Sequence, residues 1–64
     1  MSTPVDSTKR YEIRLLPVQG KVRLFAIAAS TGREAAEYAK VLLLRHTDCE
    51  SAEIWCGMTL IRRL

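Results

Sequence analysis

Four side chains in the C-terminal half of the chain have the chemistry of metal ligands. His46 and Cys49 form an H-x-x-C spacing, Asp48 lies between them, and Cys56 follows further along. A structural Zn²⁺ site takes four nitrogen or sulfur ligands in a closed tetrahedron. Three such ligands at irregular spacing fall short, and a histidine at a helix end, favoured there by the helix dipole, with two ordinary thiols explains the same residues. We therefore expect no metal and no cofactor.

The same cysteines and histidine could also form a nucleophilic site. Such a site needs a thiol of low pKa, a third group that orients the base, and a cleft. A small sheet with a single helix leaves little volume for a cleft, and the chain has no glycine-rich phosphate loop. We therefore expect that the protein is not an enzyme.

Length and composition indicate one small globular domain. The chain has 64 residues, of which 48% are hydrophobic and 27% charged, and its formal net charge is +3. These values are typical of a folded chain and far from those of disordered segments. No run approaches the roughly 20 apolar residues of a membrane span. The N-terminus lacks the apolar stretch of a secretory signal, so we expect a cytoplasmic protein with both cysteines reduced.

The elements are expected to begin after a disordered tail over residues 1–8, which leaves residues 9–64 as the domain. The segment from Tyr11 to Leu16 alternates apolar and polar residues, the pattern of a half-buried strand. Pro17 to Gly20 has the composition of a turn. Lys21 to Ala29 then resumes the alternation, which predicts a hairpin.

The hairpin assigns its side chains to two faces. A loop of two or four residues makes paired positions sum to an odd number, and this rule gives one face: Tyr11, Ile13, Leu15, Leu24, Ala26 and Ala28. The other face then carries Glu12, Arg14, Leu16, Arg23, Phe25 and Ile27. The small alanines leave room for a helix, so we expect the first face to lie beneath it.

A helix is predicted from Thr31 to about Arg45 or His46. Thr31-Gly32-Arg33-Glu34 fits a capping box. The following residues recur at helical spacing and are expected to face the sheet: Ala35, Ala39, Leu42, Leu43 and His46.

After a polar loop over residues 46–51, Ala52 to Cys56 alternates again. A hairpin turning at residues 56–59 is favoured, with one continuous bulged strand as the alternative. The expected fold is therefore α+β, of ββαβ or ββαββ type, with an antiparallel sheet and one helix on one face.

These segments together resemble a group of very short bacterial proteins. The likeness rests on Tyr11, the glycine-containing turn, the helix from Glu34 to Leu43, the segment Glu53-Ile54-Trp55-Cys56-Gly57 and the final Leu64. Members of that group have a strand pair, an EA-rich helix and a V-W-x-G segment. Here Ile54 replaces the usual valine and Cys56 a residue that is often polar. The group is uncharacterised, so the resemblance implies the fold and no activity.

One helix covers one face of a sheet, so the other face is the expected interaction surface. Its candidate residues are Arg14, Leu16, Arg23, Phe25, Ile27 and Trp55. In the alternative, Trp55 packs beneath the edge of the helix and the patch is smaller. Apolar side chains among mixed charges suit a protein interface, and a homodimer is the expected assembly. A second candidate surface on the helix comprises Tyr38, Val41 and Leu44. The alternative is a small nucleic-acid-binding module that stacks bases on exposed aromatics beside arginines.

Overall fold

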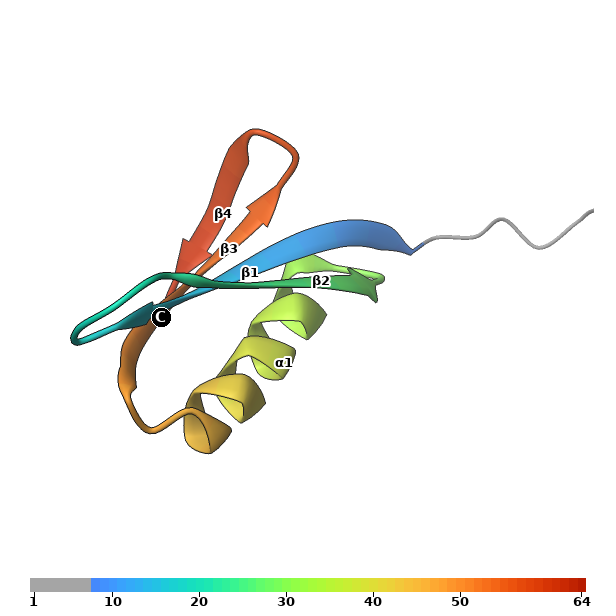
Figure 1. The fold of residues 1–64 in the computed structure, drawn as a ribbon. Coiled ribbons are helices and arrows are strands. Elements are labelled where there is room, and N and C mark those ends of the chain that lie inside the picture. The colour runs from blue at the N-terminus through green and yellow to red at the C-terminus, as the bar shows by residue number, and fades with distance from the viewer. Residues whose placement is uncertain (1–7) are drawn as a thin grey trace, which may run out of the picture.

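The computed structural model describes residues 8–64 and has four strands and one helix (Figure 1). The elements in chain order are β1 (Lys9–Pro17), β2 (Arg23–Ala29), α1 (Gly32–Arg45), β3 (Cys49–Cys56) and β4 (Thr59–Arg63). The fold is α+β, as the sequence predicted, and of the two predicted types it is ββαββ. The expected tail lies, apart from Thr8, outside the described residues.

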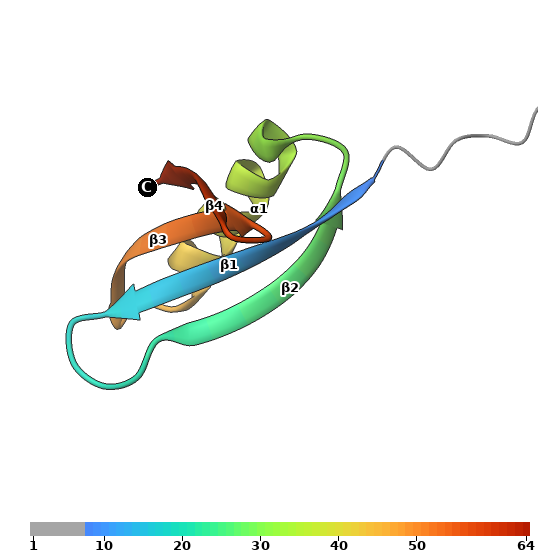
Figure 2. The same ribbon diagram turned by 90° about the horizontal axis from the view of Figure 1, so that it is seen from above.

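All four strands form one antiparallel sheet in the order β2-β1-β3-β4. The helix α1 crosses one side of this sheet, over its middle strands, and leaves the other side open (Figures 1 and 2). The first strand is therefore central, paired with β2 on one side and with β3 on the other. Two strands, β2 and β4, form the edges.

The predicted face assignment of β2 is wrong. In the structure Ile13 lies opposite Phe25, and Leu15 lies opposite Arg23. Directly opposed residues share a face, so three predicted open-face residues, Arg23, Phe25 and Ile27, lie on the helix side. The small residues expected beneath the helix, Ala26 and Ala28, are exposed on the open side together with Leu24.

The reversal comes from the length of the connection. Five residues, 18–22, separate the two strands, whereas the prediction assumed an even number. Pro17 belongs to the end of β1 rather than to the turn, and the next residue, Val18, donates its N–H to the carbonyl of Asp48 at 3.0 Å. A shift of one residue in register moves every side chain of a strand to the opposite face. Compared with the prediction, the open face therefore carries Leu24 in place of Phe25 and Ile27.

The helix begins where the capping pattern predicted. Thr31 has an extended backbone, and its hydroxyl accepts a hydrogen bond from the N–H of Glu34 at 3.1 Å. The Glu34 carboxylate accepts at 3.4 Å from the N–H of Ser30, one residue before the expected position. The helix ends at Arg45, and His46 caps it by donating its N–H to Leu42.

Replacing Thr31 by alanine should therefore destabilise the protein by about 1 kcal/mol, because the N–H of Glu34 loses its partner. For a domain of this size the melting temperature should fall by roughly 4–8 °C. Thermal unfolding followed by circular dichroism at 222 nm, where the helix absorbs, measures this decrease in melting temperature. Thr31→Ser keeps the hydroxyl and should melt close to the parent. Equal losses in both variants would mean that the cap does not stabilise the helix.

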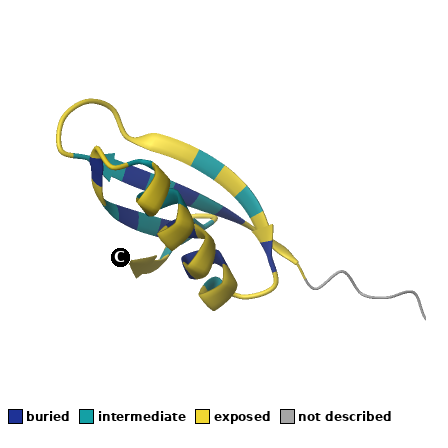
Figure 3. Ribbon diagram, turned by 90° about the horizontal axis from the view of Figure 1, so that it is seen from below, coloured by how far each residue is buried: buried dark blue, intermediate teal, exposed yellow. Residues whose placement is uncertain are grey.

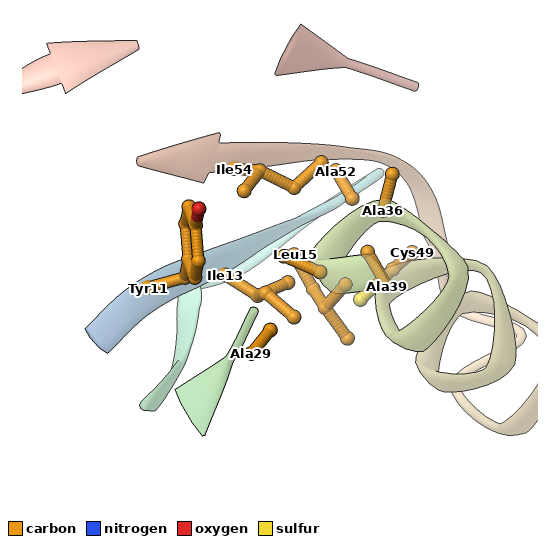
Figure 4. Packing of buried hydrophobic residues seen from close by; sticks show 10 residues of the cluster. Tyr11, Ile13, Leu15, Ala29, Ala36, Ala39, Cys49, Ala52 and Ile54 are labelled. Carbon is orange, nitrogen blue, oxygen red and sulfur yellow. The ribbon is translucent and has the colours of Figure 1, made fainter. Parts of the chain in front are cut away.

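The core is thin and lies between α1 and the sheet (Figure 4). Its buried apolar residues are Tyr11, Ile13, Leu15, Ala29, Ala35, Ala36, Ala39, Cys49, Ala52 and Ile54. Half of them are alanines, and the largest fully buried side chains are Ile13, Leu15 and Ile54. The alanines allow the helix to approach the sheet closely, but they bury little apolar area.

The C-terminal strands form the predicted hairpin. Cys56 pairs with Thr59, which leaves Gly57 and Met58 as the turn. Gly57 has a φ of 61°, and Met58 has no positive φ, a combination that a type II′ turn requires and that glycine allows without strain. The polar loop is shorter than expected, because β3 already begins at Cys49. Within residues 8–64 no helix has the length and apolar character needed to cross a membrane.

Candidate interaction surface

The open face of the sheet is the side opposite α1. Register and strand alternation place these residues on it: Arg10, Glu12, Arg14, Leu16, Leu24, Ala26, Ala28, Ser51, Glu53, Trp55, Leu60 and Arg63. Three of the predicted interface residues, Arg14, Leu16 and Trp55, are among them. The structure does not bring the other three, Arg23, Phe25 and Ile27, to this face.

A connected group of charged and aromatic side chains occupies the middle of the open face. The Arg14 guanidinium lies 4.4 Å from the centre of the Trp55 ring, and its Nε donates to Glu12 at 2.8 Å. The Trp55 indole N–H donates to Glu53 at 3.0 Å. Glu53 also lies 3.4 Å from the Nε of Arg63. Each carboxylate is therefore matched by an arginine.

This arrangement bears on the nucleic-acid alternative. Base stacking uses the open face of an aromatic ring, and the Arg14 guanidinium already covers one face of Trp55. Phosphate binding uses cations that are free of carboxylates, whereas Arg14 and Arg63 each contact a glutamate. The middle of the open face thus offers little of what a single nucleic-acid strand would use.

The apolar part of the open surface lies along β2. Leu24 is 61% exposed, and Ala26 and Ala28 are exposed beside it. On the helix side of the same strand, Phe25 and Ile27 pack against the core but remain half-buried. Figure 3 shows β2 exposed along much of its length, in contrast to β1 beside it. Both sides of this strand therefore present apolar atoms to solvent.

The second predicted surface is exposed on the helix. Tyr38 is 54% exposed, Val41 48% and Leu44 80%. They follow each other at three-residue intervals, so they form one stripe along the outer side of α1. Nothing among the described residues covers this stripe.

A polar cluster that the sequence did not predict joins the start of β2 to the loop before β3. The Arg23 guanidinium contacts both carboxylate oxygens of Asp48, at 2.8 and 2.7 Å. It also lies 3.3 Å from Nδ1 of His46 and 3.8 Å from Sγ of Cys49. The His46 ring packs against Phe25, with ring centres 5.5 Å apart. The reversed face assignment concealed this cluster, because it placed Arg23 on the wrong side.

The cluster brings together three of the four potential metal ligands around a fixed positive charge. His46, Asp48 and Cys49 converge on Arg23, where a cation would be repelled. Cys56 lies at the opposite end of β3, roughly 20 Å away at the usual rise per strand residue. Among residues 8–64, no three His, Cys, Asp or Glu side chains are arranged to hold a metal ion. The part of the chain that the structure describes also contains no detected pocket.

The Arg23–Asp48 pair has a defined electrostatic consequence. The hydrogen bond from Arg23 lowers the pKa of the Asp48 carboxyl below its ordinary value of 3.8, against an opposing contribution from desolvation. The same hydrogen bond, with Coulomb attraction to Asp48, raises the pKa of Arg23. A carboxyl with a lowered pKa stabilises the folded state above its unfolded pKa. That stabilisation is lost as pH falls through the folded pKa.

Asp48→Asn should therefore flatten the acid end of the stability profile. The parent should lose unfolding free energy as pH falls below about 4, and the variant should lose less over the same window. The difference should be small, because about half of each side chain is exposed and water screens the pair. Urea unfolding at several acidic pH values measures it. Parallel profiles for parent and variant would show that the pair makes no contribution.

Comparisons of this chain with protein-family models, with curated proteins and with solved structures found no match. The fold itself defines the class: a four-stranded antiparallel sheet with one helix packed on one face.

Proposed function

We propose that this chain is a non-enzymatic interaction protein that acts as a homodimer and associates through the uncovered part of its sheet. The observation that carries the proposal is the exposed apolar surface along β2. Leu24, Ala26 and Ala28 continue the open face past the charged centre, and that centre is neutralised within the molecule. An apolar strip beside balanced charges is typical of a self-complementary protein contact.

The small core supports a homodimer. With half of its buried apolar residues being alanines, the chain buries little large aliphatic surface. Domains below about 70–80 residues commonly gain stability from disulfides, metals or a partner chain. The two cysteines here are free and lie at opposite ends of β3. A second copy is therefore the partner that would supply the missing apolar burial.

We further propose that the protein is cytoplasmic, and this and its non-enzymatic character rest on the polar groups. The side chains best suited to catalysis are those of His46, Asp48 and Cys49. All three contact Arg23, and Cys49 is buried. Two unpaired thiols suit a reducing compartment.

Sedimentation at low and high salt, with and without a short RNA, tests the proposal. An apolar dimer should persist or tighten at high salt. Binding to RNA would instead weaken steeply as salt rises. A monomer that binds RNA at low salt would overturn the proposal in favour of the nucleic-acid module. A monomer under all conditions would also contradict it.

Leu24→Glu should convert the dimer to a monomer, because it places a charged side chain within the apolar strip. Arg14 lies opposite it on β1 but is already paired with Glu12. The variant should stay folded, since Leu24 is mostly exposed in the single chain. Met58→Glu is the matched control, because Met58 lies at the tip of the β3–β4 hairpin and is 97% exposed. A Leu24→Glu chain that remains dimeric would exclude the uncovered sheet as the contact.

A further inference from the structure

The two edges of the sheet differ in how well they are protected against pairing with another strand. An edge strand exposes unpaired N–H and C=O groups, and natural proteins protect such edges with charges, prolines or bulges. The β4 edge has that protection. It is five residues long, it carries Arg62 and Arg63, and its ladder with β3 contains a register shift.

The β2 edge has none of these devices. Its seven residues, RLFAIAA, carry one charge, Arg23, at the first position, and they contain no proline. Its ladder with β1 runs without a register shift from Lys9 to Leu15. Within residues 8–64 no strand pairs with its outer side. Figures 1 and 2 show β2 as the outermost strand on that side of the molecule.

The sequence of β2 is suited to pair with itself. An antiparallel pair that uses the whole strand places the middle residue, Ala26, opposite its own copy. Phe25 then lies opposite Ile27, and Leu24 lies opposite Ala28. Both pairs are apolar. Phe25 and Ile27 both point to the helix side of β2, whereas Leu24 and Ala28 both point to the open side, so each pair shares a face. The two copies of Arg23 lie at opposite ends of the seam, and each is already paired with Asp48.

We propose that two copies of this chain join through their β2 strands, antiparallel about Ala26, to form one continuous eight-stranded sheet. This inference rests on the proposed homodimer and places its contact at the β2 edge, where the apolar strips of the two copies become continuous rather than covered. Self-pairing covers the exposed edge of β2 and satisfies its outward backbone groups. It also brings the half-exposed Phe25 of one copy against Ile27 of the other, where aromatic and branched side chains pair favourably.

The position of the helix permits this arrangement. A two-fold axis perpendicular to the sheet keeps both helices on the same side. α1 crosses the middle of the sheet rather than β2, so each copy's β2 lies between its helix and the seam (Figure 2). The helices therefore do not collide. The open faces of the two sheets also join, which extends the charged and aromatic surface around Trp55 across both copies.

A charge-rescue experiment tests the contact and its register. Leu24→Glu should raise the dimer dissociation constant by up to about tenfold, because it removes the two apolar pairs of Leu24 with Ala28 across the seam. Adding Ala28→Lys should restore it to within about threefold of the parent, because each new glutamate then faces a lysine of the other copy, which gives two such pairs across the seam. Residues 24 and 28 are too far apart along one extended strand to pair within one copy. Their neighbours on β1 within that copy, Arg14 and Arg10, are the same in every variant. The Leu24→Glu, Met58→Lys chain has the same net charge and should stay monomeric.

Each outcome separates the contact from the function. A parent that is monomeric at all concentrations overturns both the homodimer and the β2 contact. A dimeric parent whose Leu24→Glu, Ala28→Lys variant stays monomeric keeps the homodimer and overturns the edge register. Rescue by Met58→Lys as effective as by Ala28→Lys would reduce the effect to net charge and also overturn it. In a mixed labelled and unlabelled dimer, the inference further requires NMR contacts between Phe25 and Ile27 of different copies.

Discussion

Replacing Leu15 by alanine is expected to remove a large part of the protein's free energy of unfolding. Leu15 is fully buried, and Figure 4 shows its side chain pointing towards the helix, near Ala39 and Cys49. Truncating a buried leucine leaves a cavity and costs about 2–5 kcal/mol. A chain of this length is stable by roughly 3–9 kcal/mol, so one substitution removes much of that margin.

Leu16→Ala is the control for this prediction. Leu16 is the next residue along β1, and it lies half-buried on the open face. The same truncation should there cost less than about 1.5 kcal/mol of folding stability, since the site can fill with water rather than form a cavity. Urea unfolding of both variants gives the comparison. A larger loss for Leu16 than for Leu15 would mean that the two faces of β1 are exchanged.

The second large effect is expected for Ala39→Leu. Ala39 is fully buried where α1 meets the sheet, and Ala35 and Ala36 are buried with it. A leucine has no space at this position, so the helix must move away from the sheet or the side chain must adopt a strained rotamer. Overpacking of this kind costs about 1–3 kcal/mol, which should lower the melting temperature by roughly 4 °C or more.

Lys40→Leu adds the same side chain to the exposed side of the helix. Leucine and lysine have similar helix propensities, so this variant should melt close to the parent. The difference between the two variants isolates the packing of the helix from its intrinsic propensity. If Ala39→Leu melts at the same temperature as Lys40→Leu, the helix does not pack on its alanines.

The elements of this fold were predictable because their signals are local. The hydroxyl of Thr31 and the carboxylate of Glu34 mark the helix start within four residues, and alternation marks each strand within its own length. Alternation within β3 favoured Trp55 on the open face, and its pairing with Glu12 confirms that placement.

The orientation of β2 was not predictable by the same means. It depends on whether the connection after β1 has an odd or even number of residues, and Pro17 can belong to a turn or to a strand end. The hydrogen bond that holds this connection comes from Val18 to Asp48, a residue distant in sequence. The Arg23 cluster was missed for the same reason, since its members come from two segments that meet only in the folded chain.

The position of β1 in the middle of the sheet determines how this chain can fold. Its pairing with β2 and the formation of α1 involve neighbours in sequence, and such local events are fast. Its pairing with β3 joins Glu12 to Trp55, almost the full length of the domain. Closing that long loop has an entropic cost, and the loop must close before Ile54 and Ala52 can complete the core. We therefore expect the β1–β3 contact, rather than helix formation, to limit the folding rate, and until it forms the free edge of β1 is accessible to other chains as well as that of β2.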